Sequence, residues 1–390
     1  MSLAERVDSH VAEQAGALRA LAERIHDHPE LRYQEHQAVA FIRETLEARG
    51  VEVEARTGGL DTAFRAVIGK RGGPRVAILA EYDALPEIGH ACGHNLIAAG
   101  AVGAFLGLLG VADELRGQVE LIGTPAEEGG GGKIRLLEAG VFEGVDAAMM
   151  YHPFDRDILM HPALASVWLE MSFHGRPSHA AAAPWDGTSA LTACLDTFRL
   201  IDGQRVHFRD GVRVHGYIKD GGQAVNIIPE RAVAEFSVRA LDVGEMNRVR
   251  AIVERCARGA ALASGVEVTI QPRQGYRDMR NNEPLADRFG AHLEAVGRPA
   301  RRVAPEVGAG STDMGDVSHA VPSIHPWIAI CDTGTTTIHQ HAFAACARSQ
   351  RGVDSMLIAA RAMARTALDV LHDDGLRAEV RARFEAARGA

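Results

Sequence analysis

The chain has 390 residues, of which 46% are hydrophobic, and a formal net charge of −9 without any run of lysines and arginines. Its length favours more than one domain. The acidic balance argues against nucleic acid or an anionic membrane surface as the main partner, so a small-molecule ligand fits better.

The beginning of the chain carries acidic charge and lacks the apolar run of a secretory signal. The longest uncharged apolar run, residues 96–112, is short for a membrane span. Its four glycines fall on one helical face, which predicts a buried helix that lies close on a sheet. Five scattered cysteines indicate a reduced protein without a disulfide framework. We therefore expect a cytoplasmic protein without a membrane partner.

Up to about residue 163, helical patterns alternate with short buried strands. The predicted helices are 9–27 and 35–49, followed by the glycine-faced helix, and the predicted strands are 75–80, 118–123 and 147–151. This alternation predicts an α/β fold with a mostly parallel sheet and helices on both faces.

From Ser166 the pattern changes to alternation with period two, which is typical of a sheet with one covered face. Strands at 166–174, 212–219, 231–240 and 265–271, with helices at 189–201 and 244–263, give the order β-α-β-β-α-β of a ferredoxin-like α+β sandwich. Helices and short buried strands return after residue 278. We therefore expect residues 1–163 and 278–390 to form a catalytic domain, and residues 164–277 to form an inserted domain.

Polar side chains of the metal-ligating kind follow three of the buried strands. Cys92 and His94 come after the first, Glu127 and Glu128 after the second, and His152 after the third. Each alone has an ordinary explanation, since a lone buried Cys is often an inert hydrophobe and adjacent acids are usually solvated. Parallel strand ends converge, however, so the set predicts a metal site.

Two adjacent carboxylates suit amide hydrolysis, because one can ligate metal while the other acts as general base toward the attacking water and the leaving nitrogen. The glycine cluster 129–132 beside them lacks the Lys-Ser/Thr pair of a phosphate loop. We expect it to allow tight backbone packing next to the site.

Several motifs in order resemble one family. They are HACGHN at 90–95, PAEEGG at 125–130, YHP at 151–153, GRPSHAAAAPWDG at 175–187, NIIPE at 226–230 and GSTDMGDVSH at 310–319. Together they resemble the co-catalytic metallopeptidases that include aminoacylases, carboxypeptidase G and related dipeptidases. The likeness is greatest to the amidohydrolase branch, which contains aminobenzoyl-glutamate hydrolases, indole-acetyl-amino-acid hydrolases and aminoacylase-like dipeptidases.

The resemblance implies two divalent metal ions per subunit, zinc first, with manganese or cobalt as alternatives. Glu127 would be the general base, and Cys92 would bridge the ions as a thiolate. The implied metal ligands are Cys92, His94, Glu128, His152 and His339. His341 is the alternative for the last of them, since a two-residue offset in a loop could serve equally well.

Three further residues qualify this resemblance. Asp83 stands where the family keeps an acid that orients a ligand His, but Glu81 takes the usual position of that His. We therefore expect Asp83 to support Glu127 or His94. Asn95 stands where many amidohydrolases have Asp, which narrows the branch to the aminobenzoyl-glutamate and dipeptidase-like relatives.

In the inserted domain, the resemblance implies that His179 reaches across a homodimer to hydrogen-bond the tetrahedral intermediate. Asn226 and Arg239 match lid positions that bind the free carboxylate of the substrate, for which a planar guanidinium is well suited. For Arg239 an ion pair with Glu235 on the same strand face is a competing interpretation. The inserted domain would thus be both lid and dimerisation domain. The role of Thr312 and Asp313 stays open.

These observations favour a metal-dependent hydrolase that cleaves the amide of an N-acyl or N-aroyl amino acid, or of a dipeptide with a free carboxylate. Two alternatives stay open. One is hydrolysis of another carbon–nitrogen bond, in an aryl amine or amidine, and the other is a non-catalytic metal- or ligand-binding protein on the same scaffold.

Overall fold

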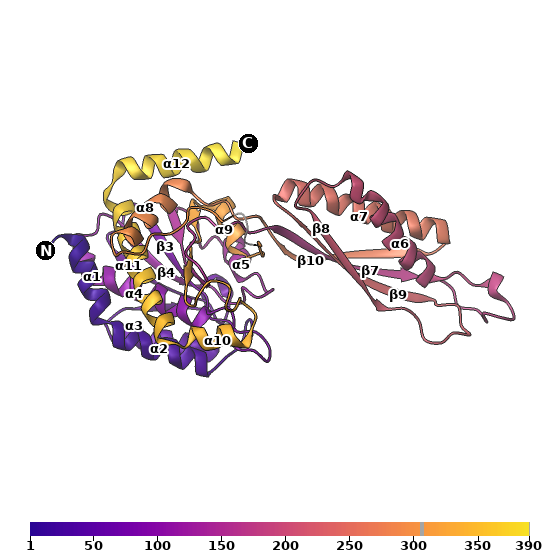
Figure 1. The fold of residues 1–390 in the computed structure, drawn as a ribbon, viewed down its shortest axis with the longest axis horizontal. Helices are drawn as coiled ribbons and strands as arrows, with labels where there is room; N and C mark the ends of the chain where they lie inside the picture. Colours follow the sequence, from indigo (N-terminus) through magenta and orange to yellow (C-terminus); the bar gives the residue numbers. More distant parts are fainter. Residues whose placement is uncertain (305–307, 390) are drawn as a thin grey trace. The chain divides into compact units, whose positions relative to one another are not determined.

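The structure is a computed structural model that describes residues 1–304 and 308–389 (Figure 1). The chain divides into two compact units, one made of Met1–Pro162 and Met279–Ala390 and the other of Ala163–Asp278. Each unit buries its own hydrophobic core. In the described ranges, no helix combines the length and apolar character needed to cross a membrane.

The first unit is built on a six-stranded sheet with the order β1-β2-β4-β3-β5-β11. The pairs β4/β3, β3/β5 and β5/β11 are parallel, whereas β1/β2 and β2/β4 are antiparallel. The strands are β1 (Val53–Ala55), β2 (Phe64–Gly69), β3 (Arg75–Ala80), β4 (Gln118–Gly123), β5 (Ala147–Met149) and β11 (Ser323–Ile324). Two more, β6 (His152–Phe154) and β12 (Trp327–Ala329), form a separate parallel pair. The predicted mostly parallel α/β sheet is confirmed.

The helices of this unit are α1 (Leu3–Glu13), α2 (Ala15–Asp27), α3 (His36–Glu47), α4 (His94–Leu109), α5 (Gly132–Glu138), α8 (Glu283–Glu294), α9 (Met314–Ala320), α10 (His341–Ala347), α11 (Gln350–His372) and α12 (Asp374–Gly389). Helices α4 and α11 pack against each other and against β3. The single helix predicted over 9–27 is wrong, because the chain forms α1 and α2 with a break at Gln14. Both helices face α4, so the apolar spacing continues across the break and hides it.

The glycines of α4 make room for other helices. A Cβ on Gly103 would lie 2.8 Å from Leu18 of α2, and one on Gly107 would lie 2.5 Å from Val11 of α1. The predicted buried helix is therefore present, but its glycine face receives α1 and α2. The helix also packs on the sheet as expected, since it contacts β3 and a Cβ on Gly100 would lie 2.6 Å from Tyr151.

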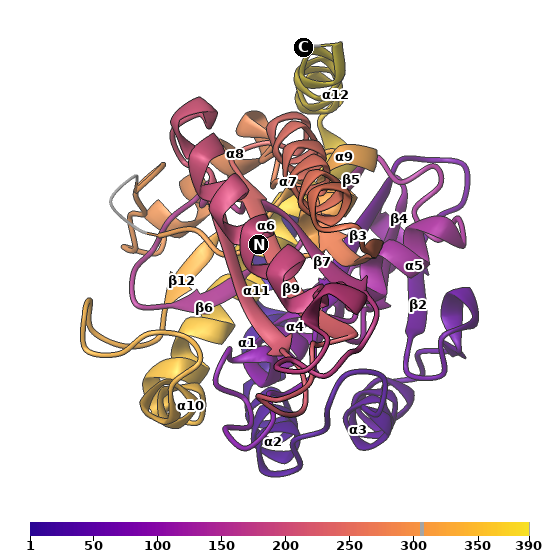
Figure 2. The same cartoon turned by 90° about the vertical axis from the view of Figure 1, so that its right-hand side faces the viewer.

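The second unit has the chain order β7 (Ala165–His174), α6 (Ala190–Gln204), β8 (Arg213–Asp220), β9 (Arg231–Ala240), α7 (Val243–Ser264) and β10 (Glu267–Tyr276). Its sheet is antiparallel throughout, with the order β10-β7-β9-β8. Helices α6 and α7 lie side by side (Figure 2) and cover one face of the sheet. This arrangement matches the β-α-β-β-α-β sandwich that the sequence predicts.

Candidate metal centre

The carboxylates of the candidate site follow two paired parallel strands that end at the same level. Ala80, the last residue of β3, is opposite Gly123, the last residue of β4. The segments that follow therefore meet, and the Asp83 Oδ2 atom accepts a hydrogen bond from the backbone N–H of Glu128 at 3.0 Å. Asp83 Oδ1 also lies 3.1 Å from Nδ1 of His94. Of the two expected partners of Asp83, His94 is thus in direct contact.

The thiol and imidazole are placed by the start of α4. Gly93 precedes the helix with φ 79°, and a Cβ there would lie 2.8 Å from Pro153 Cγ. Only glycine combines this left-handed backbone with so close an approach. The contact brings the next segment to the site, so that one ligand atom each of Cys92, His94 and His152 lie within 4.8 Å of one another.

His152 is held differently from the prediction. It does not end the strand that starts at 147, because β5 stops at Met149 and His152 begins β6. Its Nδ1 lies 2.7 Å from its neighbour's carbonyl oxygen, Pro153 O, and its ring stacks on Trp327 at 5.3 Å. Burial, and then the neighbouring His94, lower the pKa of His152 to about 3. The ring is therefore neutral and Nε2 keeps a lone pair for a cation.

His339 reaches the site from the loop before α10. Its backbone N–H donates to Ala91 O at 2.9 Å, its φ is 65°, and its Nε2 lies 3.5 Å from Glu128 Oε1. One possible ligand atom each of His339, Cys92 and Glu128 lie within 4.8 Å of one another. His341 is exposed on α10 and, among the described residues, belongs to no such group. The geometry thus favours His339 over His341.

Several buried polar atoms of the site have no hydrogen-bond partner among the described residues. They are Glu81 Oε2, His94 Nε2 and Glu128 Oε1. The Nδ1 atom of His94 is 2.8 Å from Asp83 O, so in the neutral ring that a metal ligand requires, the orphaned Nε2 carries the lone pair. Buried polar atoms normally find partners. Thiol, imidazole and carboxylate donors at these separations fit divalent metal ions such as zinc.

Glu127 belongs to two groups of possible metal-ligand atoms. One of its oxygens is within 4.8 Å of ligand atoms of His94 and Glu128, and one is equally near Glu81 and Asp313. Burial, followed by the charges of Glu81 and Glu128, raises the pKa of Glu127 well above its ordinary value. A carboxylate with this environment binds a proton more readily than a surface glutamate, as a general base requires.

The turn that carries Glu127 is clamped by the connection between α2 and α3. Glu35 Oε1 accepts the backbone N–H groups of Ala126 and Tyr33, each at 2.9 Å. Ala126 and Tyr33 both have positive φ, 60° and 61°. The Tyr33 hydroxyl donates to Gly130 O at 2.6 Å. This clamp was not predicted from the sequence, because nothing in the local pattern marks Glu35 as fully buried.

The glycines beside Glu127 pack as expected. A Cβ on Gly132 would lie 1.8 Å from Pro125 O, and one on Gly130 would lie 2.5 Å from Ala126 Cβ. Lys133, which follows them, is fully buried and pairs with Glu81 and Asp313. This lysine was not predicted as a site residue. The sequence signal that could have marked it is the rarity of lysine, since only three lysines occur in the chain.

Asn95 lies beneath the site and ties two helices together. Its Nδ2 donates to Ala22 O of α2 at 3.2 Å and to Ala347 O of α10 at 3.0 Å. An aspartate cannot donate these two bonds. The residue that distinguishes the branch therefore has a structural role next to His94.

His179 and Asn226 lie together at the loop end of the second unit. Ala180 N–H donates to Asn226 O at 2.9 Å, and both side chains are exposed. Nδ1 of His179 accepts the backbone N–H groups of Ala181 and Ala182 at 3.2 and 3.1 Å. The proton of the neutral ring is therefore on Nε2, which can donate to an oxyanion.

Arg239 lies near the opposite end of the same sheet. Strand β9 runs from Arg231, opposite His174, to Ala240, opposite Ala165. Eight residues at about 3.3 Å each put Arg239 roughly 26 Å along the strand from Arg231. The competing ion pair is not formed, since Glu235 pairs with Arg273 and no described carboxylate forms a salt bridge with Arg239. Its guanidinium lies 5.7 Å from the Trp168 ring centroid.

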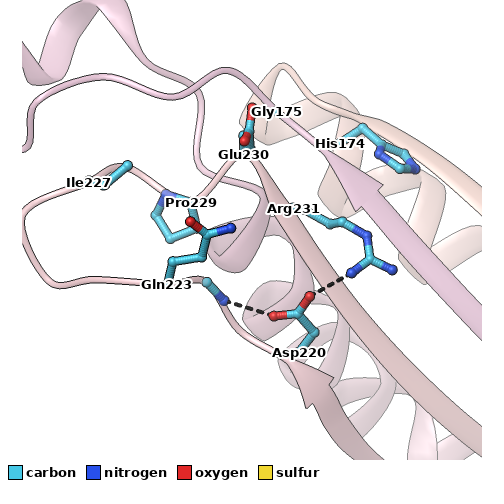
Figure 3. Close-up of a pocket in the computed structure, with 9 residues that line it drawn as sticks. His174, Gly175, Asp220, Gln223, Ile227, Pro229, Glu230 and Arg231 are labelled. Carbon is cyan, nitrogen blue, oxygen red and sulfur yellow. Dashed lines mark hydrogen bonds and ion pairs between the residues drawn. The ribbon is translucent and has the colours of Figure 1, made fainter.

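A pocket of about 320 Å³ opens at the loop end of this sheet, between the ends of β7 and β8 (Figure 3). Two of its charged lining residues pair with each other, because Asp220 Oδ2 accepts from Arg231 at 2.6 Å, and Asp220 Oδ1 accepts from the Gly222 N–H at 3.2 Å. It contains none of the candidate metal ligands.

Comparison with known proteins places these residues in context. A profile of peptidase family M20/M25/M40 matches residues 77–369. The Xaa-Arg dipeptidase of Mus musculus is 38% identical, over 98% of this chain and 91% of the relative. A component of the p-aminobenzoyl-glutamate hydrolase of Escherichia coli is 29% identical, over 91% of this chain and 89% of that relative.

Solved structures share the fold. A Bacillus subtilis protein described as a dinuclear metal binding peptidase superposes with a TM-score of 0.70, at 24% identity, and the match covers 91% of this chain and 99% of that one. The resemblance drawn from the motifs is therefore confirmed at the level of the family and of the fold.

Proposed function

The chain belongs to peptidase family M20/M25/M40, and on this premise we propose that it hydrolyses the amide bond of an N-acyl or N-aroyl amino acid, or of a dipeptide with a free carboxylate. The observation that carries the proposal is the position of Glu127 between the ligand atoms of His94 and Glu128 and the carboxylates of Glu81 and Asp313. The chain is a hydrolase of a metallopeptidase family, and Glu127 is its proposed general base.

Two divalent ions would be held by Cys92, His94, Glu128, His152 and His339, with zinc as first choice and manganese or cobalt as alternatives. When bound, such ions polarise a carbonyl and lower the pKa of a water to about 7. Glu127 takes the proton of the attacking water and transfers it to the leaving nitrogen. Asp83 keeps the His94 ring oriented, and Glu35 keeps the Glu127 turn in place.

The proposal assigns the substrate carboxylate to Asn226 and Arg239, and the oxyanion to Nε2 of His179. Within one chain, Asn226 and Arg239 flank opposite ends of a strand about 26 Å long, which exceeds the length of a dipeptide. Two copies of the chain resolve this, one supplying Arg239 and the other supplying His179 and Asn226. We therefore propose a homodimer through the second unit.

The surface of the second unit supports this assembly. Strand β8 is an edge strand, so one side of its backbone has no strand partner in the described sheet. Tyr217 on β8, Leu200 on α6 and Val206 are exposed apolar side chains, at 55%, 44% and 80%. A second copy adding its own β8 would cover such an edge.

Five free cysteines accord with a reducing, cytoplasmic location.

A substrate panel tests the activity. Protein loaded with Zn²⁺ or Mn²⁺ is assayed with dipeptides that end in arginine, the class named by its mouse relative, with N-acyl and N-aroyl amino acids, and with the same compounds amidated at the carboxylate. We expect turnover that falls at least tenfold on amidation and a matching loss in Arg239→Ala. Equal turnover of acid and amide would contradict the carboxylate assignment.

Subunit mixing tests the dimer. Neither Glu127→Gln nor His179→Ala homodimers should be active, and mixing them should restore activity in the hybrid, which carries one intact pair. Mixing two different Glu127 variants is the control. Lack of restoration in a demonstrated hybrid would overturn the assignment of His179 to the other subunit.

A further inference from the structure

Lys133 carries a positive charge into the acidic side of the site. Its side chain is fully buried, and its Nζ lies 2.5 Å from Glu81 Oε1 and 2.7 Å from Asp313 Oδ1. Its backbone N–H also donates to Asp313 Oδ2 at 3.0 Å. One lysine thus joins the segment after β3, the start of α5 and the loop before α9.

The ammonium lies where a cation would otherwise fit. Carboxylate oxygens of Glu81, Glu127 and Asp313 lie within 4.8 Å of one another, a spacing that could hold a metal ion. Two of these three residues bind the ammonium instead. Burial opposes the charged form, but Asp313 and Glu81 raise the pKa of Lys133 above its ordinary value, so the charge is retained.

The remaining oxygen of Glu81 points to the candidate metal ligands. Glu81 Oε2 lies 3.6 Å from Nε2 of His94, and neither atom has a hydrogen-bond partner among the described residues. Because Lys133 binds the other oxygen, it determines the direction of this carboxylate. Without the ammonium, Glu81, Glu127 and Asp313 would repel one another, and the burial of Glu81 and Asp313 strengthens that repulsion.

We propose that Lys133 is a built-in cation of this site: its ammonium fills a third cation position, formed by Glu81, Glu127 and Asp313, and holds these carboxylates around the general base. Lys133 is fully buried and would act through the carboxylates that it binds, so it is a positioning residue. The proposal deepens the proposed function and rests on it for its kinetic effect, but its effect on metal binding is independent of any substrate.

Counting bound ions tests the proposal directly. Wild type, Lys133→Ala and the control Lys219→Ala are dialysed against saturating Mn²⁺ and their metal content is measured. Lys219 is matched because it also pairs with a carboxylate, Glu170, at 3.0 Å, but in the other unit. We expect Lys133→Ala to bind one ion more than wild type and Lys219→Ala the same number. An equal or smaller number in folded Lys133→Ala would overturn the proposal.

Kinetics with charge-balanced variants provide a second test, which also serves if Lys133→Ala does not fold. Lys133→Met should lower kcat about 100-fold with KM within threefold, as expected for a displaced catalytic group. Glu81→Gln combined with Lys133→Met restores the net charge of the site. The double variant should have a kcat at least tenfold higher than Lys133→Met alone. No recovery, or wild-type kcat in Lys133→Met, would contradict the proposal. A wild-type protein that hydrolyses no amide would refute the proposed function and leave the ion count intact.

Discussion

Replacing Glu35 by alanine should impair catalysis from a distance. Glu35 is not one of the candidate metal ligands, and it acts on the Glu127 turn through the backbone, because its Oε1 accepts the N–H groups of Ala126 and Tyr33. Removing it leaves the buried Ala126 N–H and the partly buried Tyr33 N–H unpaired, and the buried donor alone should lower the free energy of unfolding by about 1–3 kcal/mol. The turn then loses the bond that holds Ala126 at positive φ, and a shift of Glu127 by about 1 Å should lower kcat about 100-fold.

The assay compares Glu35→Ala with Glu30→Ala. Glu30 lies in the same connection and accepts the N–H groups of Gln37 and Ala38 at the start of α3, so its loss also costs stability, by about 1 kcal/mol. Urea unfolding, kcat, KM and metal content are measured for both. We expect both variants to be less stable and only Glu35→Ala to lose kcat. Equal losses of kcat in the two variants, or wild-type kcat in Glu35→Ala, would refute the proposed role of Glu35 in holding the Glu127 turn.

Burial raises the pKa of Glu35 to about 7 from 4.5, so this group stabilises the fold most below pH 4.5 and loses about 3 kcal/mol as the pH rises to 7. Urea unfolding of wild type and Glu35→Gln between pH 4 and 8 should show this loss in wild type only, and parallel curves would contradict it. Asn95→Asp removes two donated hydrogen bonds and should lower the free energy of unfolding in urea by about 2–4 kcal/mol. Near-wild-type stability would contradict this expectation. Gly93→Ala, with a Cβ forced toward Pro153, should weaken metal binding at least tenfold in chelator competition. Unchanged affinity there would mean that the close approach does not position the ligands.

The parts of the site that were predictable are those that follow strands. Cys92, His94, Glu127 and Glu128 follow two strands that end in register, so residue type and strand position were enough to place them together. His152 was correctly expected at the site, but the prediction that it ends a strand starting at residue 147 was wrong. The step from β5 to β6 lies within one buried apolar run, so the sequence does not mark it.

The parts that were missed depend on tertiary burial of charge. Glu35 and Lys133 are polar residues whose ordinary place is the surface, and only the assembled fold buries them. Likewise, Asn226 and Arg239 are close in sequence, yet a full strand separates them in space. A motif assigns such residues to one ligand without giving the distance that the fold puts between them.

The central claim is that Glu127 is the general base of a two-metal amidohydrolase. The most direct measurement is turnover of the best substrate by Glu127→Gln, with metal content determined on the same sample. We expect two bound ions, as in wild type, and a kcat reduced by about 10³-fold or more, in line with the loss of a positioned proton-transfer group. Normal turnover with the metal retained would contradict the account.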